Sequence, residues 1–278
     1  MSNGGIIGPV NDPTSLPKIT TITSSNPAFV FNPATTSFDY LVVAGGGGSN
    51  STGIGNAGTG AGGLKYATSN PMTGGTSIAV TIGAGGGDSS STPGSPSSIS
   101  GPTPVSTSGG GHGVARGAGG ASGGSGGGGG DGYPSNTTPG GSGTPGEGNP
   151  GGGGGPGEPS GGGGGAGSAG GIGPLGGSTP GNGTTLTITG SSVVYAIGGN
   201  GEGYPGTPTD GNNPFGIDVY TPGAAPAPRQ NKGYGSLYSA GGPGVVVISE
   251  NGGGTKVASG VWTLQEAYNY KKAGNWTS

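Results

Sequence analysis

Apolar residues in this chain gather in short segments with the alternation typical of β-strands. Residues 38–44 are apolar on nearly both parities, as expected for a strand covered on both faces. Residues 77–82 alternate, so that Ile78, Val80 and Ile82 share one face. Strands of this length, bounded by Gly, Pro, Asn or Ser, favour a small β-sandwich and a mainly-β fold. The other expected strands are residues 185–189, 192–197 and 244–249, with weaker candidates at 18–23 and 28–31.

Glycine recurs at every third position in long runs between residues 101 and 183. A period of three is that of the left-handed polyproline II helix, which has no internal hydrogen bonds. Such helices can hydrogen-bond to one another when they pack side by side, and only glycine lets their backbones approach that closely. We therefore expect an inserted bundle of polyglycine II helices, with turns at 133–139, 156–160 and 178–182. The expected packing positions are Gly117, Gly120, Gly123, Gly126, Gly129, Gly161, Gly164, Gly167, Gly170 and Gly173.

The composition narrows the fold classes. The chain has 79 Gly and 25 Pro among 278 residues, and only 7% of its residues are charged. Long apolar side chains are too few for a conventional helical or α/β domain. Two alternatives are a disordered Gly/Ser linker and a collagen triple helix. The strand-like segments argue against the linker, and slips of the glycine register at the Pro-rich turns argue against collagen.

The same composition bears on chemistry. The chain has no Cys and a single His, so it lacks a disulfide framework, thiolate metal sites and most acid–base machinery. His112 and Asp131 come without a nucleophile motif, and no strand–glycine–helix unit for a dinucleotide is present. We expect no enzyme activity, no cofactor and no metal. The eight Lys and Arg are scattered and the net charge is −3, which excludes a basic nucleic-acid surface. No apolar run of about 18 residues predicts a membrane span.

Three glycine-bearing segments carry a family resemblance: residues 40–48, 78–86 and 241–248. With them, residues 37–250 resemble the glycine-rich domain of fibre and adhesin proteins of tailed bacteriophages. Residues 258–268 are similar to a terminal segment of marine-phage virion proteins, and residues 4–11 to the start of such proteins. The resemblance implies a structural virion protein that is oligomeric and often trimeric. It also implies a polyglycine bundle whose tip loops contact the host surface.

Aromatic residues flanked by Asp, Asn and Arg gather in residues 203–238. Flat rings stack on sugars or protein surfaces, and short polar chains bind hydroxyl groups, so this loop is a candidate contact surface. The alternative is that these rings fill a thin core. A calcium loop at residues 210–218 is disfavoured by its spacing. The candidate receptor contacts are Tyr133, Tyr204, Phe215, Tyr220, Arg229, Tyr234 and Tyr238.

The two ends of the chain are candidate anchors. Residues 1–16 carry Ile6 and Ile7 among Gly and Pro, and suit an extended arm added to a neighbouring sheet edge. A disordered end is the alternative. Near the C-terminus a capping box at 263–266 and Gly274 predict a short helix over residues 264–273. This helix either covers the open end of the sandwich or anchors the chain to another subunit or to the virion. The anchor candidates there are Trp262, Leu264, Tyr268 and Trp276.

These observations predict four regions: an arm with the first strands (1–36), a β-sandwich (37–100 with 184–250), a glycine-rich bundle (101–183) and a helical tail (251–278). The expected function is that of a structural or adhesive virion protein on the particle surface, such as a fibre, adhesin or decoration subunit. Expected partners are other virion proteins, further copies of the chain with a trimer favoured, and a host glycan or protein. An ice-binding protein and a purely structural coat or filament subunit are the alternatives.

Overall fold

The structure is a computed structural model that describes residues 17–49, 56–87, 91–157, 159–172, 178–202, 232–237 and 239–252. This part of the chain forms strands and no helix, so the fold is mainly β, as predicted. The expected helix at 264–273 lies outside the described residues. The strands are β1 Lys18–Ile22, β2 Asn26–Val30, β3 Ser37–Val43, β4 Leu64–Pro71, β5 Ser77–Thr81, β6 Ser97–Ile99, β7 Val105–Thr107, β8 Thr184–Leu186, β9 Val193–Tyr195 and β10 Val245–Asn251.

Two four-stranded antiparallel sheets pack face to face. One has the order β1-β10-β3-β4 and the other β2-β5-β6-β7. Between them lies a hydrophobic core to which Phe38, Val42 and Ile248 come from the first sheet, and Ile78 and Val80 from the second. The alternation predicted for residues 77–82 thus places Ile78 and Val80 on the buried face.

The central strands β3 and β10 are also covered on their other face. Leu41, Val43, Val245 and Val247 point away from the first core and pack in a second cluster, which includes Ile188. This cluster contains residues of the two-stranded β8–β9 sheet. The prediction that residues 38–44 form a strand covered on both faces is confirmed, because apolar positions of both parities are buried.

Three strands were not predicted: β4, β6 and β7. Strand β4 has the sequence LKYATSNP, which is largely polar and ends in proline. It lies at the edge of its sheet and only some of its residues are half-buried, so it needs no apolar pattern. Strands β6 and β7 have three residues each, too few to show a period.

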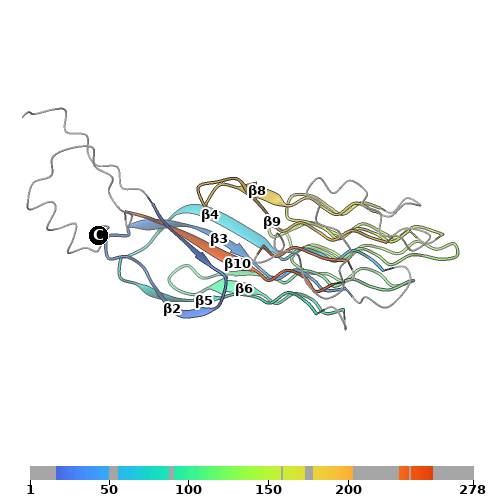
Figure 1. Ribbon diagram of the computed structural model, residues 1–278, viewed down its shortest axis with the longest axis horizontal. Coiled ribbons are helices and arrows are strands. Elements are labelled where there is room, and N and C mark those ends of the chain that lie inside the picture. Colours follow the sequence, from blue (N-terminus) through green and yellow to red (C-terminus); the bar gives the residue numbers. More distant parts are fainter. Residues whose placement is uncertain are drawn as a thin grey trace, which may run out of the picture.

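Four long connections leave the sheets and return to them at the same end of the molecule. They are residues 44–63 between β3 and β4, 82–96 between β5 and β6, 108–183 between β7 and β8, and 196–244 between β9 and β10. In Figure 1 the strands occupy one end, and the described parts of these connections run side by side away from them. The predicted insertion at 101–183 corresponds to the longest connection. The other three were not expected to join it.

Three aromatic rings pack together within the core between the two sheets. Phe31 is fully buried, and its ring centroid lies 5.2 Å from that of Phe29 and 5.0 Å from that of Phe38, both in edge-on geometry. Because large apolar side chains are few in this chain, each buried ring carries a large share of the core.

We expect Phe31→Ala to lower the free energy of unfolding by about 3–5 kcal/mol, because it removes a buried ring and leaves a cavity. The neighbouring Val30→Ala is the matched control. Val30 is 56% exposed, so its truncation is expected to change stability by no more than about 0.5 kcal/mol. Chemical denaturation of both variants measures the difference. Equal effects would contradict the assignment of Phe31 to the core.

Candidate functional site

Residues 57–63 form a fully buried segment of the glycine-rich connections. Their backbone N–H groups point in turn to three different neighbours, and every third one returns to the same neighbour. The donor–acceptor distances are 2.8–3.0 Å, in the range of good backbone hydrogen bonds. Residues 57, 60 and 63 donate to 114, 111 and 108, residues 58 and 61 donate to 161 and 164, and residues 59 and 62 donate to 236 and 233.

The carbonyl groups of the same segment follow the same threefold rotation toward three further neighbours. Residues 58 and 61 accept from 128 and 125, residues 60 and 63 from 47 and 44, and residues 56 and 59 from 202 and 199. The segment is therefore surrounded by six others. The neighbour at 161–164 runs parallel to it, because its partner numbers rise along the chain, and the other five run antiparallel, because theirs fall.

The rotation recurs in other connections. In residues 44–49 the N–H groups of 44 and 47 go to 63 and 60, those of 45 and 48 to 95 and 92, and those of 46 and 49 to 242 and 239. In residues 160–166 the N–H groups of 160, 163 and 166 go to 202, 199 and 196. Backbone polar groups that form no sheet ladder are thereby paired between segments, as burial requires.

Glycine is required here because a side chain would overlap a neighbouring backbone. A Cβ atom on Gly58 would overlap the carbonyl oxygen of Gly199, and one on Gly60 would overlap that of Ser125. Of the predicted packing positions, Gly120, Gly123, Gly126, Gly161, Gly164 and Gly170 are enclosed in the same way. A Cβ on Gly129 would lie 2.7 Å from the oxygen of Pro139, and one on Gly167 would lie 2.5 Å from that of Gly183.

Glycine is required at more positions than the predicted every third one. Gly127, Gly128, Gly162 and Gly163 lie between the predicted positions, and a Cβ on any of them would also come within 2.4 Å or less of a backbone oxygen. A segment with neighbours on all sides has no open direction, so interior positions of every register are crowded. Gly117 is not a packing position: its φ is +77°, and a Cβ there would meet nothing within 4 Å. Gly173 lies outside the described residues.

Buried carboxylates act as additional acceptors in this network, and the sequence pattern did not predict them. An Oε2 atom of Glu202 accepts the N–H of Asn56 at 2.7 Å, while the N–H of Glu202 donates to the carbonyl of Asn56 at 3.0 Å. Glu147 accepts the N–H of Ser108 at 2.7 Å and pairs with Lys65 at 2.9 Å. Hydrogen bonds to ionised groups are stronger than those between neutral groups.

A second feature lies at the end of the connections remote from the sheets. Residues 108–114 lead away from β7, because residue 108 pairs with Gly63 next to β4 and residue 114 pairs with Ala57. Beyond them, Arg116 Nε donates to both oxygens of the fully buried Asp131, at 2.8 and 3.1 Å. The Arg116 guanidinium carbon lies 4.8 Å from the centre of the Tyr133 ring, which is 54% exposed. Asp131 thus orients a cation beside an exposed aromatic ring.

The remaining predicted contact residues separate into two groups. Tyr234 is buried: the residue is 4% exposed, and its hydroxyl donates to the carbonyl of Val194 at 2.6 Å. Burial, with a smaller contribution from the neighbouring Tyr195, raises the pKa of Tyr234 to about 12. Outside the described residues lie Tyr204, Phe215, Tyr220, Arg229 and Tyr238, and the anchor candidates Ile6, Ile7, Trp262, Leu264, Tyr268 and Trp276.

Within the described part of the chain, no group of three or more His, Asp and Glu residues could hold a metal ion. No helix among these residues is long and apolar enough to cross a membrane.

A family model described as a glycine-rich domain matches residues 21–266. The chain belongs to this glycine-rich domain family. The match spans both sheets and all four connections, so in this glycine-rich domain the strands and the glycine segments belong to one unit of sequence. No curated protein matches the chain.

We expect Gly60→Ala to lower the free energy of unfolding by at least about 1–3 kcal/mol, because its methyl group would overlap the carbonyl oxygen of Ser125. Gly119→Ala is the control. Gly119 is exposed, and its methyl group would lie 3.3 Å from Cγ of the exposed Pro139, so we expect a change within about 1 kcal/mol. Thermal unfolding followed by circular dichroism compares the two. A Gly60 variant as stable as the Gly119 variant would rule out the close approach.

Tyr234 gives the glycine-rich domain a pH dependence at alkaline pH. Because folding raises its pKa from 10.0 to about 12, the folded state holds the phenolic proton more tightly than the unfolded state. The resulting stability is complete below pH 10 and is lost as the pH rises toward 12. We expect Tyr234→Phe to cost about 1 kcal/mol at pH 8 through the lost hydrogen bond. The difference from the natural chain should shrink above pH 10, as measured by denaturation at each pH. A constant difference would contradict the raised pKa.

Proposed function

We propose that the four connections form a bundle of polyglycine II helices, and that the protein is a structural and adhesive subunit on the surface of a phage virion. The threefold rotation of the backbone hydrogen bonds carries this proposal, because a helix with three residues per turn directs every third N–H to the same neighbour. Six neighbours around residues 57–63 fit the interior of such a bundle.

The bundle suits a spacer. Hydrogen bonds to neighbours on all sides resist bending and shear, and few side chains protrude from the interior segments. The sheets hold both ends of each connection, so the bundle projects from them as one body (Figure 1). Such a spacer would hold its terminal loops away from the particle to which the sheets are attached.

The remote end would make the adhesive contacts. There the exposed Tyr133 ring lies against a guanidinium that Asp131 orients. Aromatic and arginine side chains dominate many interaction surfaces, since they bring large contact area and fixed hydrogen-bond geometry. Contacts of this size are weak singly, and many copies on one particle would multiply them.

Adsorption of the purified, fluorescently labelled protein to a panel of bacterial cells tests the adhesive role. Flow cytometry should detect binding to a subset of the panel, and Tyr133→Ala should reduce that binding at least tenfold, which corresponds to about 1.4 kcal/mol. Val30→Ala, an exposed change in β2, is the control and should bind as the natural chain does.

Two results would contradict this role. Binding that is unchanged in the Tyr133→Ala variant would remove the remote end from the contact. Absence of binding to every strain of the panel would favour a purely structural subunit. A gap between the freezing and melting temperatures of a solution of the unlabelled protein (thermal hysteresis) would instead favour an ice-binding function.

A further inference from the structure

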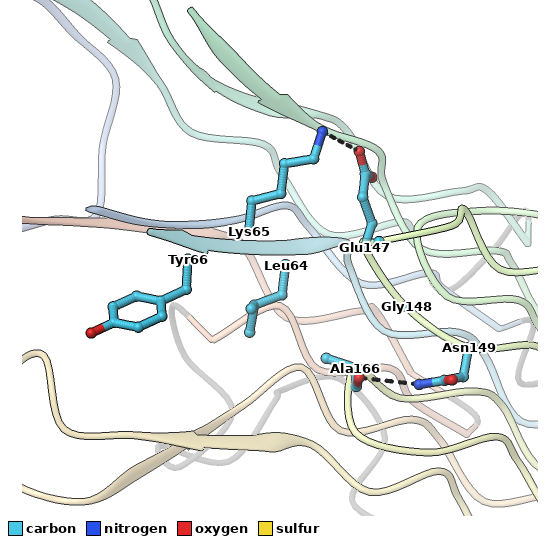
Figure 2. Close-up of a pocket in the computed structure, with 8 residues that line it drawn as sticks. Leu64, Lys65, Tyr66, Glu147, Gly148, Asn149 and Ala166 are labelled. Atoms are coloured by element: carbon cyan, nitrogen blue, oxygen red, sulfur yellow. Dashed lines mark hydrogen bonds and ion pairs between the residues drawn. The ribbon is translucent and has the colours of Figure 1, made fainter. Parts of the chain in front are cut away.

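A groove of about 440 Å³ lies where strand β4 meets the glycine-rich connections. Its volume falls within the range of roughly 300–1,000 Å³ found for small-molecule sites. Figure 2 shows the residues around it: Leu64 and Tyr66 project from the same face of β4, while the segments at Asn149 and Ala166 lie across from them. The groove is distinct from the remote end, because Leu64 is the first residue of β4.

Tyr66 offers an aromatic surface on a fixed support. It pairs with Leu41 of the fully buried centre of β3, so its backbone is held by the sheet. Its side chain is 43% exposed, and within the described chain its hydroxyl has no hydrogen-bond partner. Exposed aromatic rings on rigid strands are suited to stack against the apolar face of a flat ligand.

Asn149 provides a hydrogen-bond acceptor of fixed orientation. Its Nδ2 donates to the carbonyl of Gly165 at 2.9 Å and to that of Ala166 at 3.1 Å. Both acceptors are carbonyl oxygens, so the amide nitrogen rather than the amide oxygen faces them. The Oδ1 atom accepts no hydrogen bond from the described residues.

The charges beside the groove cancel. Lys65 projects from the opposite face of β4, where its Nζ lies 2.9 Å from Oε1 of Glu147 and donates to the carbonyl of Ser106 at 2.8 Å. The lining therefore carries no net charge. Gly146 adds open space, since a Cβ there would meet nothing within 4 Å. An uncharged ligand with hydroxyl donors and an apolar face matches this lining better than an ionic one.

We propose that this groove binds a neutral saccharide. The ring of Tyr66 stacks on the C–H face of one sugar unit, Leu64 and Ala166 contact its apolar edge, and a hydroxyl group donates to Oδ1 of Asn149. The site is independent of the adhesive contacts at the remote end, and it holds whether or not the protein is a virion subunit.

Isothermal titration calorimetry with maltohexaose, cellohexaose and chitohexaose tests the proposal on the full chain, with oligogalacturonate as the charged comparison. At least one neutral oligosaccharide should bind, and Tyr66→Ala should weaken it at least tenfold. Tyr66→Phe should retain most of the affinity, because stacking needs the ring and not the hydroxyl. Val30→Ala, an exposed change in β2, should bind as the natural chain does.

Three outcomes would overturn it: no neutral oligosaccharide binds at ~10 mM, oligogalacturonate binds more tightly than all three, or Tyr66→Ala leaves the affinity unchanged. A two-dimensional amide NMR spectrum of each variant verifies the fold. An extended Thr-Val repeat peptide that shifts Tyr66 and Asn149 signals while the saccharides shift none would assign the groove to strand addition along β4 and likewise overturn the proposal.

Discussion

The structure depends on pairing the backbone polar groups of buried glycine segments that belong to no sheet. An unpaired buried N–H or carbonyl costs more than most single contacts contribute in a chain with so few apolar side chains. The threefold rotation around residues 57–63 solves this problem, because every N–H of the segment donates to a neighbour and most of its carbonyl groups accept from another. The solution is possible only where carbonyl oxygens occupy the space that a Cβ would take, as Gly199 and Ser125 do beside Gly58 and Gly60.

Ordering glycine is costly, because glycine loses more backbone freedom on folding than any other residue. The sheets reduce that cost. Each connection begins and ends at a strand, and where the two flanking strands pair with each other, the chain ends that must be brought together are already close. The strands that flank the connection 44–63 are β3 and β4, which pair directly. The hydrophobic core between the sheets therefore stabilises segments that contain hardly any hydrophobic residues themselves.

The sequence predicts the parts of this arrangement in which burial leaves a pattern of apolar residues. A strand with a buried face has a recognisable pattern of apolar residues, and β3, β5 and β10 were predicted from that pattern. Strand β4 has Tyr66 exposed and Pro71 at its end, so its pairing with β3 leaves no apolar pattern. The glycines at 45–48 could be taken for the end of a strand, and only the partners at residues 60, 92 and 242 reveal their place in the network. Tyr133 was predicted from its place in a turn. The position of Arg116 against its ring could not be predicted, because Arg116 lies well before Tyr133 in the sequence.

Two of the four buried carboxylates in the described part of the chain, Glu147 and Glu202, lie at ends of the glycine network. Glu147 lies at the boundary with the sheets: its carboxylate accepts the N–H of Ser108, which follows β7, and its carbonyl accepts the N–H of Leu64, which begins β4. Glu202 lies toward the remote end and exchanges two hydrogen bonds with Asn56, the described residue that precedes the segment 57–63. At such places a neighbouring segment no longer supplies a carbonyl at the right position, and a flexible carboxylate can reach the N–H instead. Side chains thus extend a network built from one repeated backbone geometry, both at its ends and inside it, where the Thr59 hydroxyl donates to the carbonyl of Gly47 and accepts the N–H of Ser236.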